Sequence, residues 1–331
     1  MTSPVVTVVI RTYNRCDLLA KAIDSVLCQS LCDFELLIID DYSTDKTTEV
    51  VSNFKQNDNR IVYIRHERNR GAAASFNTAH AVAKGTFVAY LDDDDTWRSD
   101  KLEKQVQVFE SNENEVGMVT CGVQHWNSDD VKKLGKWVPK YKGYVYQIAL
   151  DDSSIIFGPP SAVMLRKEAI DKIGNYREDM KRGCCQQYFL RFSKVFPICF
   201  TSDILVDYNF HENAITTIQT DQDIINSIDA LLIIINTIED DLVDFPHMYS
   251  KKLINIAHLF AQLSDKRNSI EYYESAKKRS SYWVRQSINL LIISLKLPSS
   301  YIYEKLYHIM KYLRYIYKFY NLKKLINVPN S

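Results

Sequence analysis

The sequence predicts an α/β part, a mostly parallel sheet flanked by helices, followed by an all-α C-terminal module. Three observations support this fold class. Short apolar runs alternate with helical patterns over the first hundred residues, acidic clusters follow two of those runs, and the pattern becomes continuously helical from about residue 220. We therefore expect two domains, residues 1–218 and 219–331.

The first part of the chain alternates strands and helices. The predicted strands are residues 5–10, 34–39, 61–64 and 86–91, and the helices between them are 18–29, 47–54 and 72–83. The first strand is a continuous β-branched run, which is typical of a strand buried on both faces. This order predicts parallel strands, whose carboxyl ends form one edge where ligands bind.

The middle of the chain mixes both patterns, and the end is helical. Further strands are predicted at residues 116–123, 162–166 and 199–208, with helices at 167–173 and 188–195. The tail is predicted to form helices at 221–240, 247–262, 267–280, 282–294 and 301–318.

Composition excludes some functional classes. The 41 basic and 41 acidic residues give a formal net charge of zero, so we expect no nucleic-acid partner. The 7 cysteines are odd in number and lack metal-finger spacing, and no secretion signal precedes them, which predicts reduced thiols. No apolar run approaches the ~20 residues of a spanning helix. The expected location is the cytoplasm, either free or at the inner face of the membrane.

The strongest chemical signal is the acidic run at residues 92–95, which ends an apolar strand. Adjacent carboxylates repel one another, and a cation between them relieves that repulsion. Oxygen ligands suit Mg²⁺ or Mn²⁺. The alternative is a solvated acidic turn, which is less favoured at the end of a buried strand.

A second acidic pair, Asp40 and Asp41, also ends a predicted strand. A carboxylate here can accept the N–H of a nucleobase or the hydroxyls of a ribose. Ser43 or Asp45 can cap the following helix alone, so a helix cap leaves the two acids unexplained.

These residues carry a resemblance to a known family. The segments 8–15, 22–29 and 34–45, then 69–77 and 85–97, resemble in order and spacing the family 2 glycosyltransferases with the GT-A fold. The resemblance is strong to Trp97, weaker to about residue 217 and absent in the tail. It implies an inverting, metal-dependent hexosyltransferase, with a nucleotide-sugar donor of the UDP class and a glycan or lipid-linked acceptor.

The resemblance also assigns roles to matching positions. Thr12, Tyr13 and Asp41 would hold the nucleobase, and Arg15 would lie close to the diphosphate. The Mn²⁺ or Mg²⁺ ion would be held by Asp94 and Asp92, with Asp93 near the ribose and His211 near the metal. Two departures from the family are Arg11 in place of proline and Tyr42 in place of a glycine that favours positive φ. The segment 157–162 matches an acceptor-pocket loop, although its two prolines equally indicate a rigid turn.

The general base is the main departure. Relatives place a carboxylate before a helix that ends in an aromatic-apolar-arginine pattern, and here that position falls on Cys185, with Cys184 beside it. Three accounts compete. Glu178 or Asp179 in the same loop substitutes, the Cys185 thiolate acts as base, or the protein is a non-catalytic nucleotide-sugar-binding relative. We favour the first. A nucleotidyltransferase ranks last, because residues 11–15 contain no glycine.

The tail contains a basic segment with aromatic residues, 301–324. Such a helix suits peripheral contact with an anionic membrane, and equally an ordinary packed helix with a solvated basic face. Both interpretations stay open.

Overall fold

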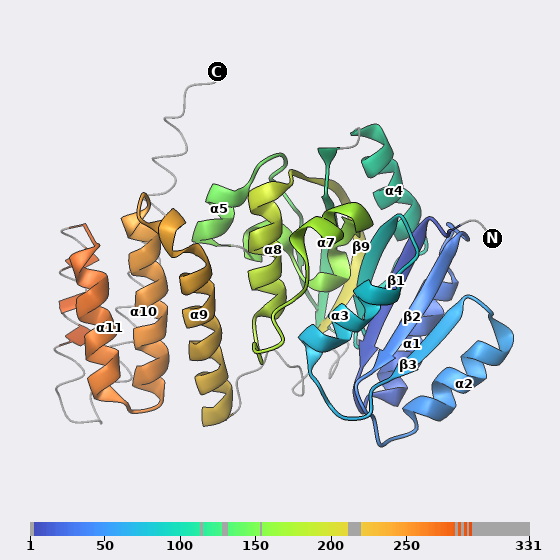
Figure 1. The fold of residues 1–331 in the computed structure, drawn as a ribbon, viewed down its shortest axis with the longest axis horizontal. Coiled ribbons are helices and arrows are strands. Elements are labelled where there is room, and N and C mark those ends of the chain that lie inside the picture. The colour runs from blue at the N-terminus through green and yellow to red at the C-terminus, as the bar shows by residue number, and fades with distance from the viewer. Residues whose placement is uncertain are drawn as a thin grey trace. The chain divides into compact units, whose positions relative to one another are not determined.

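The computed structural model describes residues 3–112, 115–127, 132–152, 154–210 and 220–281, together with 284, 285, 288, 289, 291 and 292. The chain divides into two compact units, residues 1–217 and 218–331, which are described separately. The predicted fold class is confirmed: a mixed sheet flanked by helices makes up the first unit, and helices make up the second (Figure 1).

The sheet of the first unit has the strand order β3-β2-β1-β4-β8-β6-β9-β5, with β7 paired to β6. The first four strands in that order are parallel, and β8 is antiparallel to β4. The strand bounds are Val6–Thr12 (β1), Phe34–Asp40 (β2), Ile61–Arg65 (β3), Phe87–Asp92 (β4), Thr96–Trp97 (β5), Met118–Asn127 (β6), Lys132–Trp137 (β7), Met164–Arg166 (β8) and Ile198–Phe210 (β9).

Register brings the functional segments to one edge of this sheet. Thr12 at the end of β1 is aligned with Asp40 at the end of β2, and Arg11 is aligned with Asp92 at the end of β4. The apolar residues of these strands are buried on both faces of the sheet. The loops that follow β1, β2 and β4 therefore meet.

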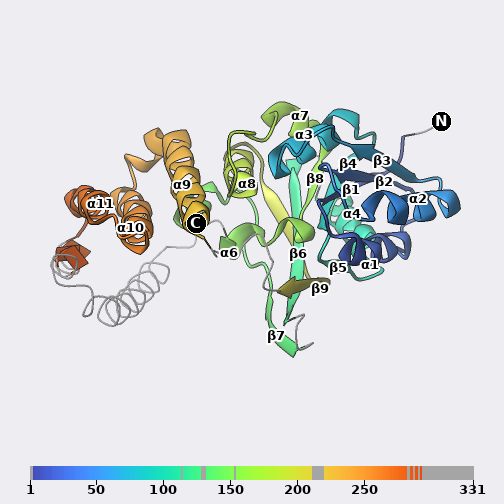
Figure 2. The ribbon, with the colours of Figure 1, turned by 90° about the horizontal axis from the view of Figure 1, so that it is seen from below.

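Helices cover both faces of the sheet; Figure 2 shows α3 and α7 on one side of the strands and α1 on the other. The helices of this unit are Cys16–Leu27 (α1), Thr47–Asn57 (α2), Ala72–Val82 (α3), Lys101–Ser111 (α4), Tyr146–Asp151 (α5), Ser154–Phe157 (α6), Lys167–Ile173 (α7) and Cys184–Val195 (α8). The sequence did not predict α4, α5, α6, β5 or β7. Of these, β7 has no apolar run and is a strand only because it pairs with β6.

His80 on α3 is a buried ionisable side chain that carries no charge. His80 is 5% exposed, and its Nε2 atom lies 2.6 Å from the Tyr90 hydroxyl. Burial lowers the pKa of His80 to about 3. The imidazole is therefore neutral in the folded protein at neutral pH.

We expect this histidine to make folding acid-sensitive. The unfolded chain binds a proton at His80 below pH ~6.5, whereas the folded chain does so only near the lowered pKa of about 3. Its contribution to stability is thus complete above ~6.5 and is lost as the pH falls toward 3. Urea midpoints at pH 7.5 and pH 5 should differ less for His80→Gln than for the wild type. An equal difference in both proteins would contradict this origin.

The second unit packs its helices around an apolar core. The helices are Asp221–Leu242 (α9), Pro246–Gln262 (α10) and Lys266–Lys278 (α11), close to the predicted bounds. Thr220 and Asp223 form a reciprocal capping box that begins α9. Ile228, Leu253 and Tyr273 belong to the core cluster. The predicted helix at 301–318 and most of the one at 282–294 lie outside the described residues.

None of the helices in the described part of the chain combines the length and apolar content that crossing a bilayer requires. All seven cysteines are free thiols, as the sequence predicts.

Candidate functional site

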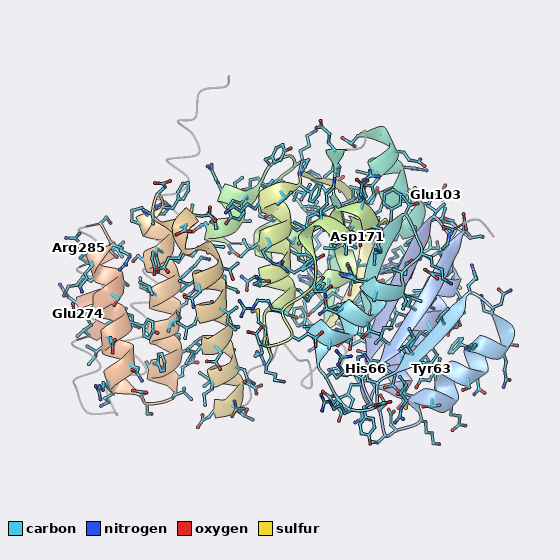
Figure 3. The ribbon with its side chains drawn as sticks, in the orientation of Figure 1. Tyr63, His66, Glu103, Asp171, Glu274 and Arg285 are labelled. Atoms are coloured by element: carbon cyan, nitrogen blue, oxygen red, sulfur yellow. The ribbon has the colours of Figure 1, made fainter. Side chains whose placement is uncertain are left out.

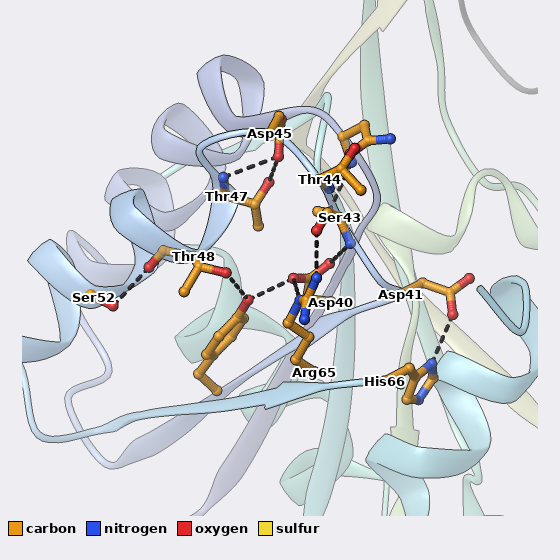
Figure 4. A network of polar contacts seen from close by, with 12 residues as sticks. Asp40, Asp41, Ser43, Thr44, Asp45, Thr47, Thr48, Ser52, Arg65 and His66 are labelled. Atoms are coloured by element: carbon orange, nitrogen blue, oxygen red, sulfur yellow. Dashed lines mark hydrogen bonds and ion pairs between the residues drawn. The ribbon is translucent and has the colours of Figure 1, made fainter. Parts of the chain in front are cut away.

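The loops after β1 and β2 are joined by hydrogen bonds (Figure 4). The Asn14 backbone N–H donates to Ser43 Oγ at 2.9 Å, and the Thr44 N–H donates to Asn14 Oδ1 at 2.7 Å. Asp45 accepts from the Cys16 N–H at the start of α1 and from the Thr47 N–H at the start of α2. Asp45 thus serves both helices, in keeping with the predicted capping role.

Asp40 is a structural residue. It is fully buried and accepts from the Ser43 N–H at 2.8 Å and from the Tyr63 hydroxyl at 2.6 Å. Arg65 Nε lies 3.4 Å from the same carboxylate. These contacts tie the end of β2 to β3 and leave Asp40 no face toward a ligand.

The Asp41 carboxylate holds the loop that contains Arg70 and Gly71. Asp41 is 6% exposed, and its carboxylate accepts from the backbone N–H groups of Arg70 and Gly71 at 2.8 and 2.7 Å. His66 Nδ1 lies 2.7 Å from Asp41 Oδ1, and Figure 3 shows Tyr63 and His66 at the same edge of the first unit. Three donors leave one of about four acceptor positions of the carboxylate for a ligand.

Tyr42 adopts the conformation that the family glycine would favour. Its φ is 75°, in the left-handed region that L side chains rarely adopt. The Arg65 guanidinium carbon lies 5.0 Å from the centroid of its ring, a cation–π contact that offsets part of the strain. The turn is therefore kept despite the substitution.

Of the predicted nucleobase residues, Thr12 and Tyr13 differ in exposure. Thr12 is 2% exposed, and its carbonyl accepts from the Asp41 N–H at 2.9 Å. Tyr13 is 46% exposed, so its ring is available to a planar ligand. Thr12, Tyr13 and Asp41 therefore lie within one loop junction.

The four acids after β4 divide into three that pair with arginines and one, Asp95, that accepts hydrogen bonds from Ser161 and Asn209. Arg11 pairs with Asp92 at 3.0 Å. Arg15 Nη1 lies 3.1 Å from Asp93 Oδ1 and 2.8 Å from Asp94 Oδ2. The guanidinium of Arg15 thus occupies the position between two carboxylates where a cation would be expected.

The fourth acid, Asp95, fixes the loop. It is 1% exposed, accepts from Ser161 Oγ at 2.5 Å and accepts from the Asn209 N–H at 3.1 Å. Asn209 also donates to the Asp94 carbonyl, and Ser161 Oγ accepts from the Asp92 N–H. The 157–162 segment therefore acts here as a rigid support, and Ser161 and Asn209 are residues that the sequence did not single out.

Burial is the main influence on the charge of this loop. Burial raises the pKa of Asp92, of Asp93 and, most strongly, of Asp95, and the neighbouring acids add to the rise. Arg11 and Arg15 oppose the shift for Asp92 and Asp93. The negative charge of the acidic loop is therefore stabilised by the positive charge of Arg11 and Arg15 beside it.

These residues fit a hard divalent cation. Their donors are carboxylate oxygens, and the cluster already holds two guanidinium groups as counter-ions. The described residues contain no ready-made group of three or more protein ligands. Mg²⁺ is usually bound by one or two carboxylates and completes its shell with phosphate oxygens and water. The predicted third ligand, His211, lies outside the described residues.

The cysteines that replace the family base lie at the start of α8. Gly183 has a left-handed conformation with φ 69°, and Cys184 begins the helix. Charges of Arg11 and Asp92 act on both thiols. A hydrogen bond from Cys185 and the charge of Arg11 lower the pKa of Cys184, while the same bond and burial raise the pKa of Cys185 well above its ordinary value.

The two predicted substitute acids lie in ion pairs before α8. Glu178 accepts from Asn77 Nδ2 at 3.0 Å and pairs with Arg70 at 3.2 Å. Asp179 pairs with Arg177 at 2.6 Å, and its side chain is 55% exposed. Hydrogen bonds from Asn77 and from Arg177 lower the pKa of Glu178 and of Asp179 respectively. Only Glu178 is linked through Arg70 to the loop that holds Asp41.

Comparison with known proteins identifies similar sequences. The model of the family described as "Glycosyl transferase family 2" matches residues 7–174. A putative teichuronic acid biosynthesis glycosyltransferase, TuaG of Bacillus subtilis, is 42% identical over 104 residues, which is 31% of this chain and 41% of that relative. WfaP of Escherichia coli, named as a UDP-Glc:alpha-D-GlcNAc-diphosphoundecaprenol beta-1,3-glucosyltransferase, is 36% identical over 106 residues, 32% of this chain and 41% of that relative. The chain spans about half or less of the length of these curated relatives.

Solved structures share the fold. Residues 1–349 of S. aureus TarS, in complex with UDP-GlcNAc, align with a TM-score of 0.64 at 16% identity and cover 89% of this chain and 87% of that one. The mannosyltransferase PcManGT from Pyrobaculum calidifontis, in complex with GDP-Man and Mn²⁺, has a TM-score of 0.56 at 17% identity, covering 91% and 83%.

Proposed function

The chain belongs to glycosyl transferase family 2, and on that premise we propose that it transfers a sugar from a UDP-sugar to a glycan or lipid-linked glycan acceptor, with inversion and with the help of Mn²⁺ or Mg²⁺. The observation that carries this proposal is the meeting of three loops at the carboxyl edge of β1, β2 and β4. These loops place Asp41 and the ion pair between Arg15 and Asp94 at one edge of the sheet.

The donor is proposed to lie along this edge. The base would rest against Tyr13, with Thr12 beside it and the last acceptor position of Asp41 toward its N–H. Asp93 would accept from the ribose, and Arg15 would turn from the acids toward the diphosphate. The complexes of the two solved relatives with UDP-GlcNAc and with GDP-Man support a nucleotide-sugar at this fold.

Charge develops on the diphosphate as the bond to the sugar breaks. A divalent cation held by Asp94 and Asp92 would supply positive charge to the leaving group. Arg15, on its flexible side chain, can add a second positive charge at the same point, since its present partners are the acids that the cation would neutralise.

The direct test is a donor screen with the full-length protein. Several nucleotide sugars would be supplied with Mn²⁺, Mg²⁺ or a chelator, and released nucleoside diphosphate would be measured. We expect release from a UDP-sugar that depends on the added metal. Binding of nucleotide without turnover under any condition would instead support the non-catalytic alternative, which the pair Cys184 and Cys185 motivates.

Glu178 is the proposed base. The hydrogen bond with Cys184 and burial raise the pKa of the Cys185 thiol, which disfavours the thiolate that a general base requires. Asp179 is held to Arg177 on the exposed side of its segment. Glu178 is the acid tied to Arg70 and hence to the Asp41 loop.

We expect Glu178→Gln to lower kcat by about 10²-fold or more, the usual contribution of a general base, and to remove the acidic limb of the kcat pH profile. Asp179→Asn is the matched control from the same segment and should keep near wild-type activity, as should Cys185→Ser. Full activity of Glu178→Gln together with inactivity of Cys185→Ser would assign the role to the thiol.

A further inference from the structure

The hairpin of β6 and β7 is the most positively charged part of the first unit that the proposed reaction does not use. Residues 132–144 contain five lysines and no acid, whereas the whole chain has a net charge of zero. The lysines are Lys132, Lys133, Lys136, Lys140 and Lys142, and all five are exposed. No carboxylate among the described residues forms an ion pair with any of them. We call residues 132–144 the basic hairpin.

Apolar and aromatic side chains accompany these lysines. Leu134 is 53% exposed, and it lies at the irregularity in register between β6 and β7. Phe210 on the neighbouring β9 is 39% exposed and is aligned with Asn127, at the same end of β6 as Leu134. Tyr144 is 72% exposed but follows Gly143, which pairs with Ile198 at the opposite end of β6. Lys133 Nζ lies 5.8 Å from the centroid of the Trp126 ring. Leu134 is thus an exposed apolar side chain that lies between Lys133 and Lys136.

One end of the basic hairpin lies at the edge of the sheet that carries the acidic loop after β4. Because β4 is antiparallel to β8 and β8 is antiparallel to β6, the carboxyl end of β6 lies at the same edge as that of β4. Lys132 and Lys133 pair with Asn127 and Trp126 at that end. Figure 2 shows β7 extending beyond the rest of the first unit.

Side chains of β6 and β9 hold the basic hairpin in place. Trp126 Nε1 donates to Asp207 Oδ1 at 2.8 Å, and Arg98 also pairs with Asp207. On β9, the rings of Tyr208 and Phe210 pack edge to face against His125. The element that projects is therefore anchored next to Asn209, which supports the acidic loop.

We propose that the end of the basic hairpin that carries Lys132, Lys133 and Lys136 docks the protein on an anionic phospholipid bilayer, with these lysines on the headgroups and Leu134 at the boundary of the acyl chains. Clusters of lysines bind anionic headgroups. The exposed leucine favours a bilayer over a soluble polyanion, which offers no apolar phase. This proposal goes beyond the transfer reaction and does not depend on it.

The experiment is vesicle co-sedimentation of the full-length protein, with phosphatidylcholine vesicles that contain or lack phosphatidylglycerol. We expect binding only to the anionic vesicles, weakening as salt is raised. The triple change Lys132→Glu, Lys133→Glu and Lys136→Glu should reduce the partition coefficient by about 100-fold. The control changes the same number of exposed lysines on α1, on α2 and at the N-cap of α2, outside the basic hairpin: Lys21→Glu, Lys46→Glu and Lys55→Glu.

The control triple should bind as the wild type does, and Leu134→Ser should bind more weakly at every salt concentration. Three results would overturn the proposal: no binding of the wild type, equal binding to both vesicles, or undiminished binding of the hairpin triple, which would place the contact elsewhere, as in residues 301–324. Binding of dextran sulfate without vesicle binding would indicate a soluble polyanion instead. Calorimetry with UDP, measured on each variant, separates loss of docking from loss of the proposed donor site.

Discussion

Asp94→Asn is expected to lower the transfer rate by about 10³-fold, the scale of losing a main electrostatic contact to a leaving group. The amide keeps the size of the side chain and removes its charge. Because the side chain pairs with Arg15 at the surface of the loop while Asp95 holds the loop itself, the fold should be unchanged. Initial rates with saturating metal and donor measure the effect.

Two further measurements make this result specific. Glu110→Gln, an exposed acid on α4, is the matched control and should leave the rate unchanged. Calorimetric titration with UDP should show a gain in affinity on adding Mn²⁺ for the wild type and a much smaller gain for Asp94→Asn. If the variant keeps both its rate and its response to the metal, Asp94 is not the principal ligand.

Gly85→Ala is expected to destabilise the first unit by at least about 3 kcal/mol, more than most single substitutions do. A Cβ atom at Gly85 would lie 2.3 Å from the Thr7 backbone nitrogen and 2.7 Å from the Val6 carbonyl carbon. These are backbone atoms of the central strand β1, so the clash cannot be relieved by turning a side chain. The Gly85 N–H also donates to Thr7 Oγ1 at 2.8 Å, a bond that the shift would lengthen.

Urea unfolding provides the measurement, with Gly135→Ala as the control. A Cβ at Gly135 meets no atom within 4 Å, so that change should alter stability little. The β4 strand that follows Gly85 carries the acidic loop, and activity should fall with stability in Gly85→Ala. A loss below about 1 kcal/mol would show that β1 and the turn before β4 can move apart.

Much of the fold could be predicted because the relevant signals are local. The β-branched run of β1 and the apolar runs of β2 and β4 are found within two residues of their predicted bounds, because strands buried on both faces need apolar side chains at every position. The linked motifs between residues 8 and 97 also carried the family, which the match over residues 7–174 confirms.

The candidate site was predicted as a set of residues but not as an arrangement. Composition and spacing do not distinguish Asp40 from Asp41 or Asp94 from Asp95, and only the family resemblance gave roles to Asp41 and Asp94. In the structure Asp40 and Asp95 support the loops from inside, while Asp94 faces outward to Arg15. Which member of a pair is buried depends on donors such as Tyr63 or Asn209, which come from other strands.

The sequence by itself therefore determined the alternation of strands and helices as far as β4, the helices α9 to α11, the acidic edge and the family, since each depends on residues close together in the chain. Only the tertiary structure decided the antiparallel insertion of β8, the separate roles of adjacent acids and the projection of the basic hairpin. Those features depend on pairing and burial between separate segments of the chain, such as β4 with β8 or Asp95 with Asn209, and no local pattern records them.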